Sequence, residues 1–377
     1  MLNRFVFLFV FLNIWVLLGV NIFLILFLII YKLFGAIREK RYTTFIQSAK
    51  EEFEFQMLNL NSDAFTRKYK QHRKRHMIFQ LMLQITDEKG YDFHQLFDQM
   101  GFTDEIINHY LNSKETQYLK ELSIIKSPKA YSLLLHEIQA PLSENAFRAG
   151  YAMACLKLMP AQQLEVFNTL ISSQIVIEKV IDIVNLISPP IAEYLPMLNQ
   201  QATNRGRIIL LNYIHGKISL LQSNYRFLQK KLAIQSHTII QHVSPMLYFP
   251  EQVALPAIKV LGCTGHSHAL LLLLNLYKNN PNTSIKATIA QELYHFSSHE
   301  VLNDLKEMAM DKNYWVRLSA YESLSEMGDE GKQAILELST TSPYPSTNYL
   351  IYEILSENDN LQEYIENYKK ELENNVR

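Results

Sequence analysis

The sequence predicts an all-α protein in which an N-terminal transmembrane helix is followed by an α-solenoid of stacked helix pairs. Three observations lead to this fold class. The 377 residues include only 11 Gly and 12 Pro, too few turn residues for a protein built from many short strands. A long apolar run lies near the N-terminus. Amphipathic helical segments then recur at intervals of about 30 residues, a period typical of helical repeats.

The apolar run is Phe5–Phe34, in which Lys32 is the only charged residue. At about 1.5 Å of rise per residue, about 20 helical residues cross a hydrocarbon core of about 30 Å. A secretory signal peptide would have a shorter apolar stretch followed by small residues at a cleavage site, and this sequence has neither feature. We therefore expect an uncleaved, single membrane span.

Positive charge is distributed unequally about this span. Arg4 precedes it, whereas four basic residues lie at or after its end: Lys32, Arg38, Lys40 and Arg41. Loops rich in Lys and Arg stay in the cytoplasm, so we expect a single-pass membrane protein with its N-terminus outside and a cytoplasmic C-terminal domain. The two cysteines, Cys155 and Cys263, lack the spacing of a disulfide framework and agree with a reducing compartment.

Three regions are expected along the chain. Residues 1–41 are the transmembrane anchor with its basic flank, and residues 42–125 form a helical juxtamembrane region without a clear repeat. Residues 126–377 form the repeat solenoid, closed by a C-terminal capping helix, because a terminal repeat needs a polar outer face.

Six basic side chains are close together in the juxtamembrane region. They are Arg67, Lys68, Lys70, Arg73, Lys74 and Arg75. Beside a membrane, such a cluster attracts anionic lipid headgroups at about 1 kcal/mol per charge, or it contacts an acidic partner. A solvated helix face, offset by nearby acidic residues, explains the cluster equally well. Nucleic acid is not an expected partner, since the formal net charge is −1 and no aromatic stacking platform accompanies the cluster.

The repeat is clearest in the segment that begins Val316-Arg317 and buries Ala320 and Leu324 on one helical face. Similar segments start at Phe147, Val176, Gly206, Val253, Ile285 and Thr347. Consecutive starts are 29 to 32 residues apart, except for an interval of 47 residues after Gly206. We expect an extra or lengthened helix in that interval. A fixed period in this range indicates a solenoid, in which each helix pair buries its apolar face against its neighbours.

A plausible first helix and a turn precede each segment, so the segments are the second helices of helix pairs. The pattern resembles the HEAT repeat, whose second helix typically shows a Val-Arg pair followed by Ala and Leu. The copy at Val316 matches closely, and those at Ile285 and Phe147 match less fully. The resemblance covers roughly residues 126–357. It implies a right-handed α-solenoid that binds proteins along a concave surface and generally lacks catalytic residues.

The second position of four copies is basic, which makes these residues the candidates for partner binding. They are Arg148, Arg207, Lys286 and Arg317. If the four side chains project from the solenoid, they form a basic ladder suited to an acidic segment of a partner protein. The alternative is local pairing with an acidic residue of the adjacent turn, as between Arg317 and Asp311.

No pattern predicts catalysis, a cofactor or a metal. The nearest to a metal site is a set of Cys and His residues in two adjacent repeats: Cys263, His266, His268, His295 and His299. Their spacing fits no strong zinc pattern, and several lie at turns between helices. Phosphate-binding Gly loops, nucleophile elbows and the His-Glu-x-x-His motif are missing from the sequence.

These observations predict a scaffold or adaptor rather than an enzyme. We expect it to bind another protein at the cytoplasmic face of a bacterial-type membrane. One suggested partner is a membrane glycosyltransferase of envelope polysaccharide synthesis, although no residue indicates it. The alternative is a non-canonical enzyme, or an enzyme subunit, on a HEAT-like fold.

Overall fold

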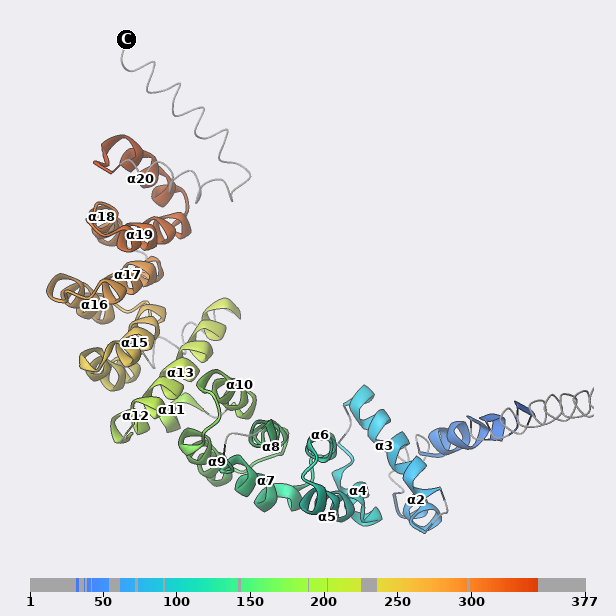
Figure 1. The fold of residues 1–377 in the computed structure, drawn as a ribbon. Coiled ribbons are helices and arrows are strands. Elements are labelled where there is room, and N and C mark those ends of the chain that lie inside the picture. The colour runs from blue at the N-terminus through green and yellow to red at the C-terminus, as the bar shows by residue number, and fades with distance from the viewer. Residues whose placement is uncertain are drawn as a thin grey trace, which may run out of the picture. The chain divides into compact units, whose positions relative to one another are not determined.

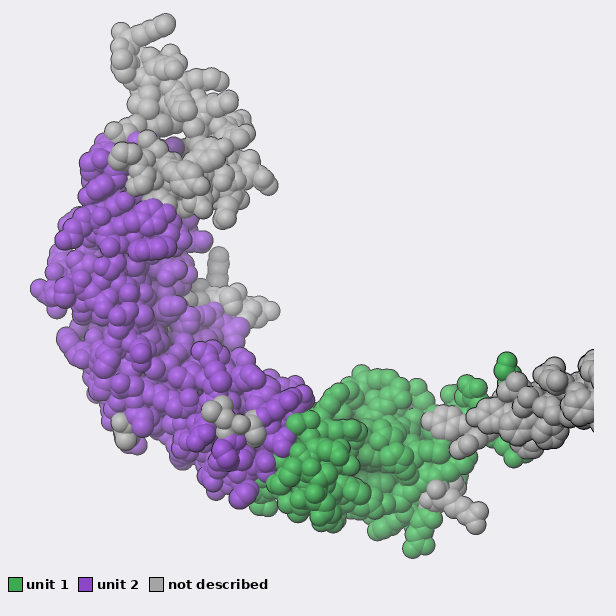
Figure 2. All heavy atoms as spheres, in the orientation of Figure 1, with its two compact units in different colours: residues 1–133 green, residues 134–377 purple. Residues whose placement is uncertain are grey.

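A computed structural model describes residues 32–33, 37, 39–41, 43–53, 62–71, 74–90, 92–141, 144–188, 190–201, 203–224, 236–296 and 299–344. These residues form helices joined by turns and no strand, which confirms the predicted all-α class for the described part of the chain. The chain divides into two compact units, residues 1–133 and residues 134–377 (Figure 2).

Unit 1 is a group of short helices around an aromatic core. Its elements are helical residues 43–53, α2 (Ser62–Tyr69), α3 (Arg75–Lys89), α4 (His94–Met100), α5 (Phe102–Ser113), α6 (Thr116–Ile125) and η1 (Pro128–Ala130). The ring of Phe53 makes edge-to-face contacts with Phe65 at 5.3 Å and Phe93 at 5.0 Å. Phe79 and Phe102 extend the core at 4.9 Å. Aromatic pairs at these separations stabilise a core beyond the area they bury.

Unit 2 contains the predicted repeats. After α7 (Tyr131–Ile138), at the boundary of the units, its elements are α8 (Glu144–Ala154), α9 (Pro160–Ser172), α10 (Ile177–Ile187), α11 (Ile191–Tyr194), α12 (Met197–Gln200), α13 (Asn204–Asn224), helical residues 236–243, η2 (Ser244–Tyr248), α15 (Glu251–Cys263), α16 (Ser267–Asn279), α17 (Thr283–Glu292), η3 (Leu293–His295), α18 (His299–Met308), α19 (Tyr314–Glu326) and α20 (Gly328–Thr341).

The second helices form one layer within unit 2, which we call the second-helix layer. It consists of α8, α10, α13, α15, α17 and α19, and each of these helices contacts the next (Figure 1). Each corresponds to one of the segments predicted from the sequence, so these second helices are confirmed. The long interval after Gly206 contains a lengthened helix, since α13 continues to Asn224. The predicted copy at Thr347 and the C-terminal capping helix lie outside the described residues.

Turns of the same design introduce α17 and α19. The side chain of Asn280 accepts a hydrogen bond from the Asn282 backbone N–H at 2.8 Å, and Asp311 accepts from Asn313 at 2.7 Å. Asn282 and Asn313 are the N-caps of α17 and α19, and their side chains accept from N–H groups of the first turn. These caps satisfy backbone donors that a helix start otherwise leaves without partners.

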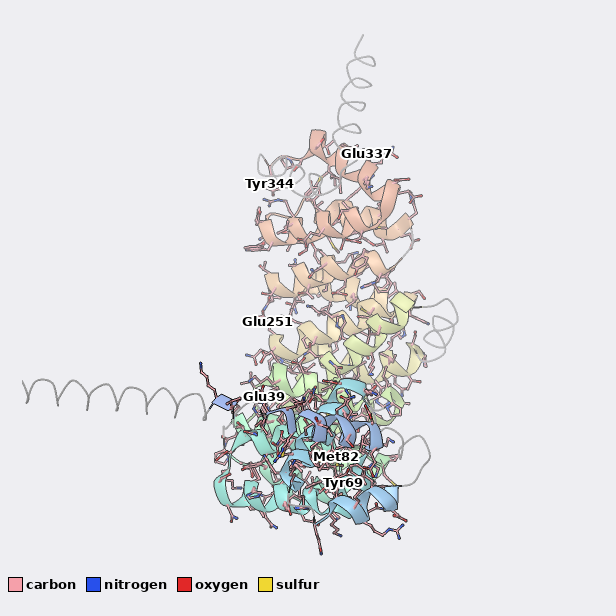
Figure 3. The ribbon with its side chains drawn as sticks, turned by 90° about the vertical axis from the view of Figure 1, so that its right-hand side faces the viewer. Glu39, Tyr69, Met82, Glu251, Glu337 and Tyr344 are labelled. Atoms are coloured by element: carbon pink, nitrogen blue, oxygen red, sulfur yellow. The ribbon has the colours of Figure 1, made fainter. Side chains whose placement is uncertain are left out.

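The same two asparagines also connect neighbouring repeats. The Asn282 amide donates to Glu251 at the start of α15 at 2.8 Å, and the Asn313 amide donates to Thr283 at the start of α17 at 3.5 Å. Glu251 is labelled in Figure 3. Because Glu251 and Thr283 are both the first residues of their helices, the caps of α17 and α19 each bond to the beginning of the preceding second helix. We call this chain of contacts the cap ladder.

The predicted location as a single-pass membrane protein requires correction. No helix in the described part of the chain is both long and apolar enough to cross a membrane. The longest helix with described bounds, α13, has 21 residues, but it carries Arg205, Arg207 and Lys217 and packs against α10 and α15. Apart from residues 32–33, the segment Phe5–Phe34 on which the prediction depended lies outside the described residues.

Candidate functional site

The starts of α13, α15, α17 and α19 form an edge of unit 2, on which Arg207, Lys286 and Arg317 lie; Arg148 lies at the start of α8, earlier in the same layer. The Arg207 guanidinium of α13 lies over the ring of Phe249, just before α15, at 4.3 Å. The cap ladder continues the contact from α15 to α17 and from α17 to α19. We call this surface the N-terminal edge of the second-helix layer.

The four predicted residues have different surroundings. Arg148 forms an ion pair with Glu144, one turn earlier in α8, at 2.6 Å. Arg207 forms no ion pair with the described residues. Its guanidinium donates a hydrogen bond to the Asn204 side chain at 3.2 Å. The Lys286 ammonium lies 4.9 Å from the centre of the Tyr277 ring, and Lys286 likewise forms no ion pair within the described part. Arg207 and Lys286 therefore place two cations without an ion-pair partner among the described residues on an edge that also carries Glu251, the first residue of α15.

Arg317 is buried and has a structural role instead. It is only 4% exposed, and its guanidinium donates to the backbone carbonyls of Asp311 and Lys312 at 2.9 and 3.1 Å. Its charged group also lies 4.1 Å from the ring of Tyr344, which is labelled in Figure 3. Buried charged donors stabilise a turn when they satisfy its carbonyls, so Arg317 holds the turn between α18 and α19.

We expect Arg317→Lys to lower the free energy of unfolding by about 1.5–3 kcal/mol, because a lysine ammonium cannot replace the guanidinium nitrogen Nη1 that donates to both carbonyls and also keep the planar contact with the Tyr344 ring. The loss is measured by chemical denaturation of the full chain. Arg148→Lys is the matched control, since Arg148 is exposed and pairs only within its own helix; a change within about 0.5 kcal/mol is expected there. Equal losses in the two variants would contradict a structural role specific to Arg317.

A second structural arginine lies on α13 and was missed by the sequence analysis. Arg205 donates from Nε to the carbonyl of Ile171 at 3.1 Å and from its guanidinium to the carbonyl of Ile175. Burial lowers the pKa of Arg205 from its ordinary value. The side chain joins the end of α9 to the start of α13, two helices of adjacent repeats. Its position immediately before Gly206 lies outside the aligned basic position, so the repeat pattern gave no signal for it.

Large aromatic side chains are exposed on the N-terminal edge. Tyr248, before α15, is 79% exposed, and Trp315, in the first turn of α19, is 62% exposed. Tyr314 makes an edge-to-face contact with Trp315 at 5.3 Å. Exposed Trp and Tyr side chains supply most of the binding energy at many protein interfaces, so their presence here indicates a contact surface.

The basic cluster of unit 1 is partly engaged in local contacts. Lys68 pairs with Glu52, Lys74 lies over the ring of Phe45, and Arg75 pairs with Glu105. Arg67 donates to the Asp63 carbonyl, Lys70 is exposed, and Arg73 lies outside the described residues. Binding of anionic lipid by this cluster stays a prediction.

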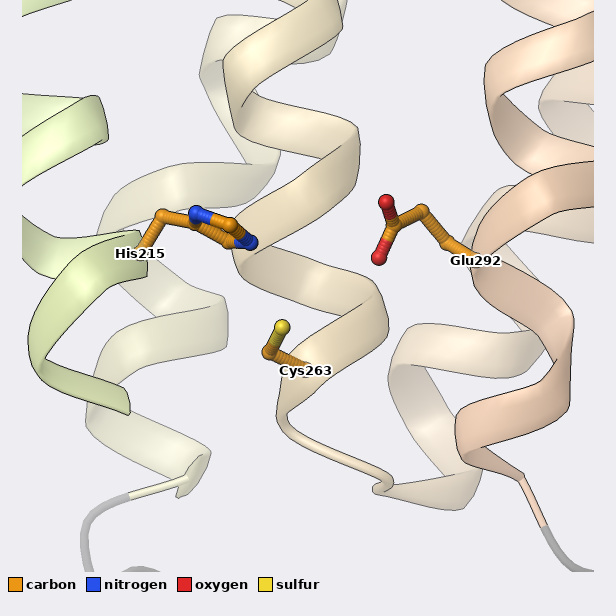
Figure 4. A group of neighbouring side chains, drawn as sticks. All are labelled: His215, Cys263 and Glu292. Carbon is orange, nitrogen blue, oxygen red and sulfur yellow. The ribbon is translucent and has the colours of Figure 1, made fainter. Parts of the chain in front are cut away.

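A buried group of polar side chains lies elsewhere in the second-helix layer, at the ends of α15 and α17. His215 of α13, Cys263 of α15 and Glu292 of α17 place one ligand-type atom each within 4.8 Å of the others (Figure 4). His295 of η3 joins them, with Nε2 at 3.5 Å from Cys263 Sγ and 3.4 Å from a Glu292 carboxylate oxygen. We call these four residues the Cys263 cluster.

The electrostatics of the Cys263 cluster favour charged forms. Burial acts to raise the pKa of the Cys263 thiol, but hydrogen bonds to His215 and His295 lower this pKa to about 7. Burial acts to lower the pKa of His295, but its bonds to Cys263 and Glu292 raise this pKa to about 9. A thiolate beside an imidazolium is therefore a principal state near neutral pH.

The sequence pattern indicated only two of the four members of this cluster. Cys263 and His295 were singled out, whereas His215 and Glu292 were not. His266 is the N-cap of α16, and its side chain accepts from the His268 backbone N–H at 3.1 Å. His266, His268 and His299 are not part of the cluster. A chemical motif search gives no signal for His215 and Glu292, because they lie 48 and 29 residues from Cys263 in other repeats.

The helix pairs, the second-helix layer and the cap ladder define the class of protein as a helical repeat protein. Comparison with known families agrees: residues 251–352 match HEAT repeats, which supports a HEAT-repeat protein. The matched stretch runs from the start of α15 past the end of α20. No curated protein matches the chain.

Proposed function

We propose that the protein is a scaffold that binds a segment of another protein along the N-terminal edge of its second-helix layer. HEAT repeats commonly mediate protein–protein interaction, and that general role supports the proposal. The observation that carries it is the exposure of Trp315 and Tyr248 on an edge that side-chain contacts join from α13 to α19. Aromatic anchors spaced along a rigid edge suit an elongated partner segment.

The charge of this edge favours an acidic segment. Arg207 and Lys286 form no ion pair in the described part of the chain, and the first turns of α13, α17 and α19 contain no acidic residue. The first turn of α15 contains one, Glu251, whose carboxylate accepts a hydrogen bond from Asn282. Opposite charge on a partner increases the association rate and fixes the register of binding. Of the predicted basic ladder, Arg207 and Lys286 are the residues that contact the partner. Arg317 instead supports the turn before α19.

We also propose that the scaffold has no catalytic activity of its own. The strongest nucleophile in the described residues, Cys263, is 2% exposed, so a substrate has no direct access to it. An open hollow beside α9, lined by Leu164, Glu165, Asn168 and neighbouring residues, contains one carboxylate and no histidine or cysteine. No contact in the described part of the chain supports a glycosyltransferase as the partner.

Site-specific photo-crosslinking in cells that normally make the protein tests the proposed surface. A photo-reactive amino acid replaces Trp315 in one variant and Tyr248 in another. The matched control is Leu271 on the first helix α16, which is 66% exposed but lies away from the N-terminal edge. We expect the same partner protein to be crosslinked from Trp315 and Tyr248 and not from Leu271. Crosslinking of that partner from Leu271 at equal yield would contradict the proposed edge.

Affinity then measures the two contributions to binding. Once the partner has been identified by crosslinking, its dissociation constant can be measured. We expect Trp315→Ala to raise this constant by a factor of about 30, which corresponds to an interfacial hot spot of about 2 kcal/mol. Charge reversal of Arg207 and Lys286 is expected to reduce the association rate, and the effect should shrink as salt is added. Circular dichroism of each variant shows whether helix content is unchanged. Turnover of any substrate by the pure full chain would defeat the non-catalytic part of the proposal.

A further inference from the structure

We propose that the Cys263 cluster is a structural zinc site, in which His215, Cys263, Glu292 and His295 are the protein ligands. The cluster offers a thiol sulfur, two imidazoles and a carboxylate. Zn²⁺ is bound in proteins by this set of ligand types, most often by four of them in a tetrahedron. The proposed partner-binding edge does not include these residues, so the two proposals are independent.

Two distances within the cluster match the edges of a zinc tetrahedron. Zinc–sulfur bonds of about 2.3 Å and zinc–nitrogen or zinc–oxygen bonds of about 2.0–2.2 Å give tetrahedral edges of about 3.6 Å from sulfur to nitrogen and about 3.4 Å from nitrogen to oxygen. Cys263 Sγ lies 3.5 Å from His295 Nε2, and His295 Nε2 lies 3.4 Å from Glu292 Oε2. Two of the distances between ligand atoms are therefore already those expected around a bound zinc ion.

The position of His215 favours a common centre over a simple chain of hydrogen bonds. A chain from Cys263 through His295 to Glu292 requires contacts between successive pairs only. His215 instead approaches from α13, on the other side of α15 from Glu292, and its ring and the Glu292 carboxylate point toward each other beside Cys263 (Figure 4). The ligand atoms of these three residues all lie within 4.8 Å of one another, so small side-chain movements bring them to one ion.

The burial of the cluster indicates a structural rather than a catalytic metal. Cys263 is 2% exposed and Glu292 is also buried, whereas His215 and His295 are half-buried, and the ligands are supplied on several sides by protein. Structural zinc sites are closed by protein ligands, whereas catalytic sites keep a position for water or substrate. The ligands come from α13, α15, α17 and η3, so one ion would fasten three successive second helices together.

Gly262 shapes this site from the adjacent position of α15. A Cβ atom built on Gly262 would lie 2.6 Å from Glu292 Cβ and 2.9 Å from Glu292 Oε2. Oε2 is the carboxylate oxygen that contacts His295. The absence of a side chain at Gly262 therefore lets α17 approach α15 closely and leaves room for the Glu292 carboxylate beside Cys263. Gly262→Ala displaces that carboxylate without removing any ligand.

Cobalt(II) titration of the metal-stripped full chain tests the proposal, because thiolate-bound cobalt in a tetrahedral site gives an intense charge-transfer band and strong visible bands. We expect one cobalt per chain, displaced by one zinc. Cys263→Ser should abolish the charge-transfer band. Glu292→Gln, which preserves shape, and His215→Gln should each weaken metal binding by at least about 10- to 100-fold, the loss typical when a residue that only supports a metal ligand is replaced. Thermal unfolding of the wild type should shift upward as zinc is added, since zinc binds the folded chain preferentially.

Two control variants make the result specific. Cys155→Ser removes the other cysteine, which lies on the turn after α8, and His266→Asn removes an imidazole next to the cluster in sequence; both should bind cobalt as the wild type does. Persistence of the band in Cys263→Ser would place the metal elsewhere and overturn the proposal. So would the absence of a 1:1 complex tighter than micromolar in a wild-type chain of unchanged circular dichroism, which would leave the cluster as a hydrogen-bonded thiolate–imidazolium pair.

Discussion

Leu324→Ala is expected to lower the free energy of unfolding by about 2–5 kcal/mol, the range for removing a fully buried leucine side chain from a packed core. Leu324 lies in α19 with no exposed surface, as do Val316 and Ala320 on the same helix. The cavity forms between α19 and its neighbours α17, α18 and α20. Chemical denaturation of the full chain measures the loss.

The location of the damage provides a stricter test than its size. In a helical repeat array each repeat contacts only its neighbours, so hydrogen exchange should quicken mainly from α17 to α20. Exchange in α8 and α10 should stay close to that of the wild type. The matched control is Leu271→Ala, an exposed leucine on α16, for which a change within about 0.5 kcal/mol is expected. Equal loss of protection across unit 2 would contradict the nearest-neighbour description.

Gly331→Ala is also expected to destabilise the protein, because no side chain can move aside to accommodate the new methyl group. A Cβ atom at Gly331 would lie 1.9 Å from the backbone carbonyl oxygen of Leu324 and 2.9 Å from its carbonyl carbon. The start of α20 must therefore separate from α19. Overpacking of this kind costs about 1–3 kcal/mol, and more when the obstacle is backbone. Thermal unfolding of the full chain measures the effect.

Gly216→Ala is the matched control for this prediction. Gly216 also lies within a helix, α13, but a Cβ atom there would have its nearest neighbour at 3.9 Å, an ordinary contact. Replacing glycine by alanine inside a helix stabilises it by up to about 1 kcal/mol, so the control should unfold at an equal or higher temperature. If both variants were stabilised, the close approach of α19 and α20 would be refuted.

The repeat could be predicted from the sequence because its signal is local and periodic. Each second helix buries small and apolar residues at constant offsets, as Val316, Ala320 and Leu324 do in α19. The turns before α17 and α19 were also visible, because Asn and Asp bond to nearby backbone N–H groups and so introduce helices. Unit 1 gave no such signal, since its core depends on contacts among Phe53, Phe65 and Phe93 that follow no fixed spacing.

The partners of individual side chains could not be predicted in the same way. The sequence suggested that Arg317 pairs with the Asp311 carboxylate, but that carboxylate already accepts from the Asn313 N–H and from the Tyr277 hydroxyl. Arg317 bonds instead to the carbonyls of Asp311 and Lys312. The Cys263 cluster was missed for a related reason. Its ligands come from different repeats, and only the stacking of α13, α15 and α17 brings them together.

The cap ladder has a consequence for how such a chain can lengthen during evolution. Asn282 and Asn313 occupy equivalent places in successive repeats, and each bonds to the first residue of the preceding second helix. A gene duplication of 31 residues, the distance from Asn282 to Asn313, would therefore supply both a new cap and the helix start to which the next cap bonds. Growth by whole repeats preserves the cap-ladder contacts between successive second helices. Selection can therefore change the length of the array without changing the residues that connect its repeats.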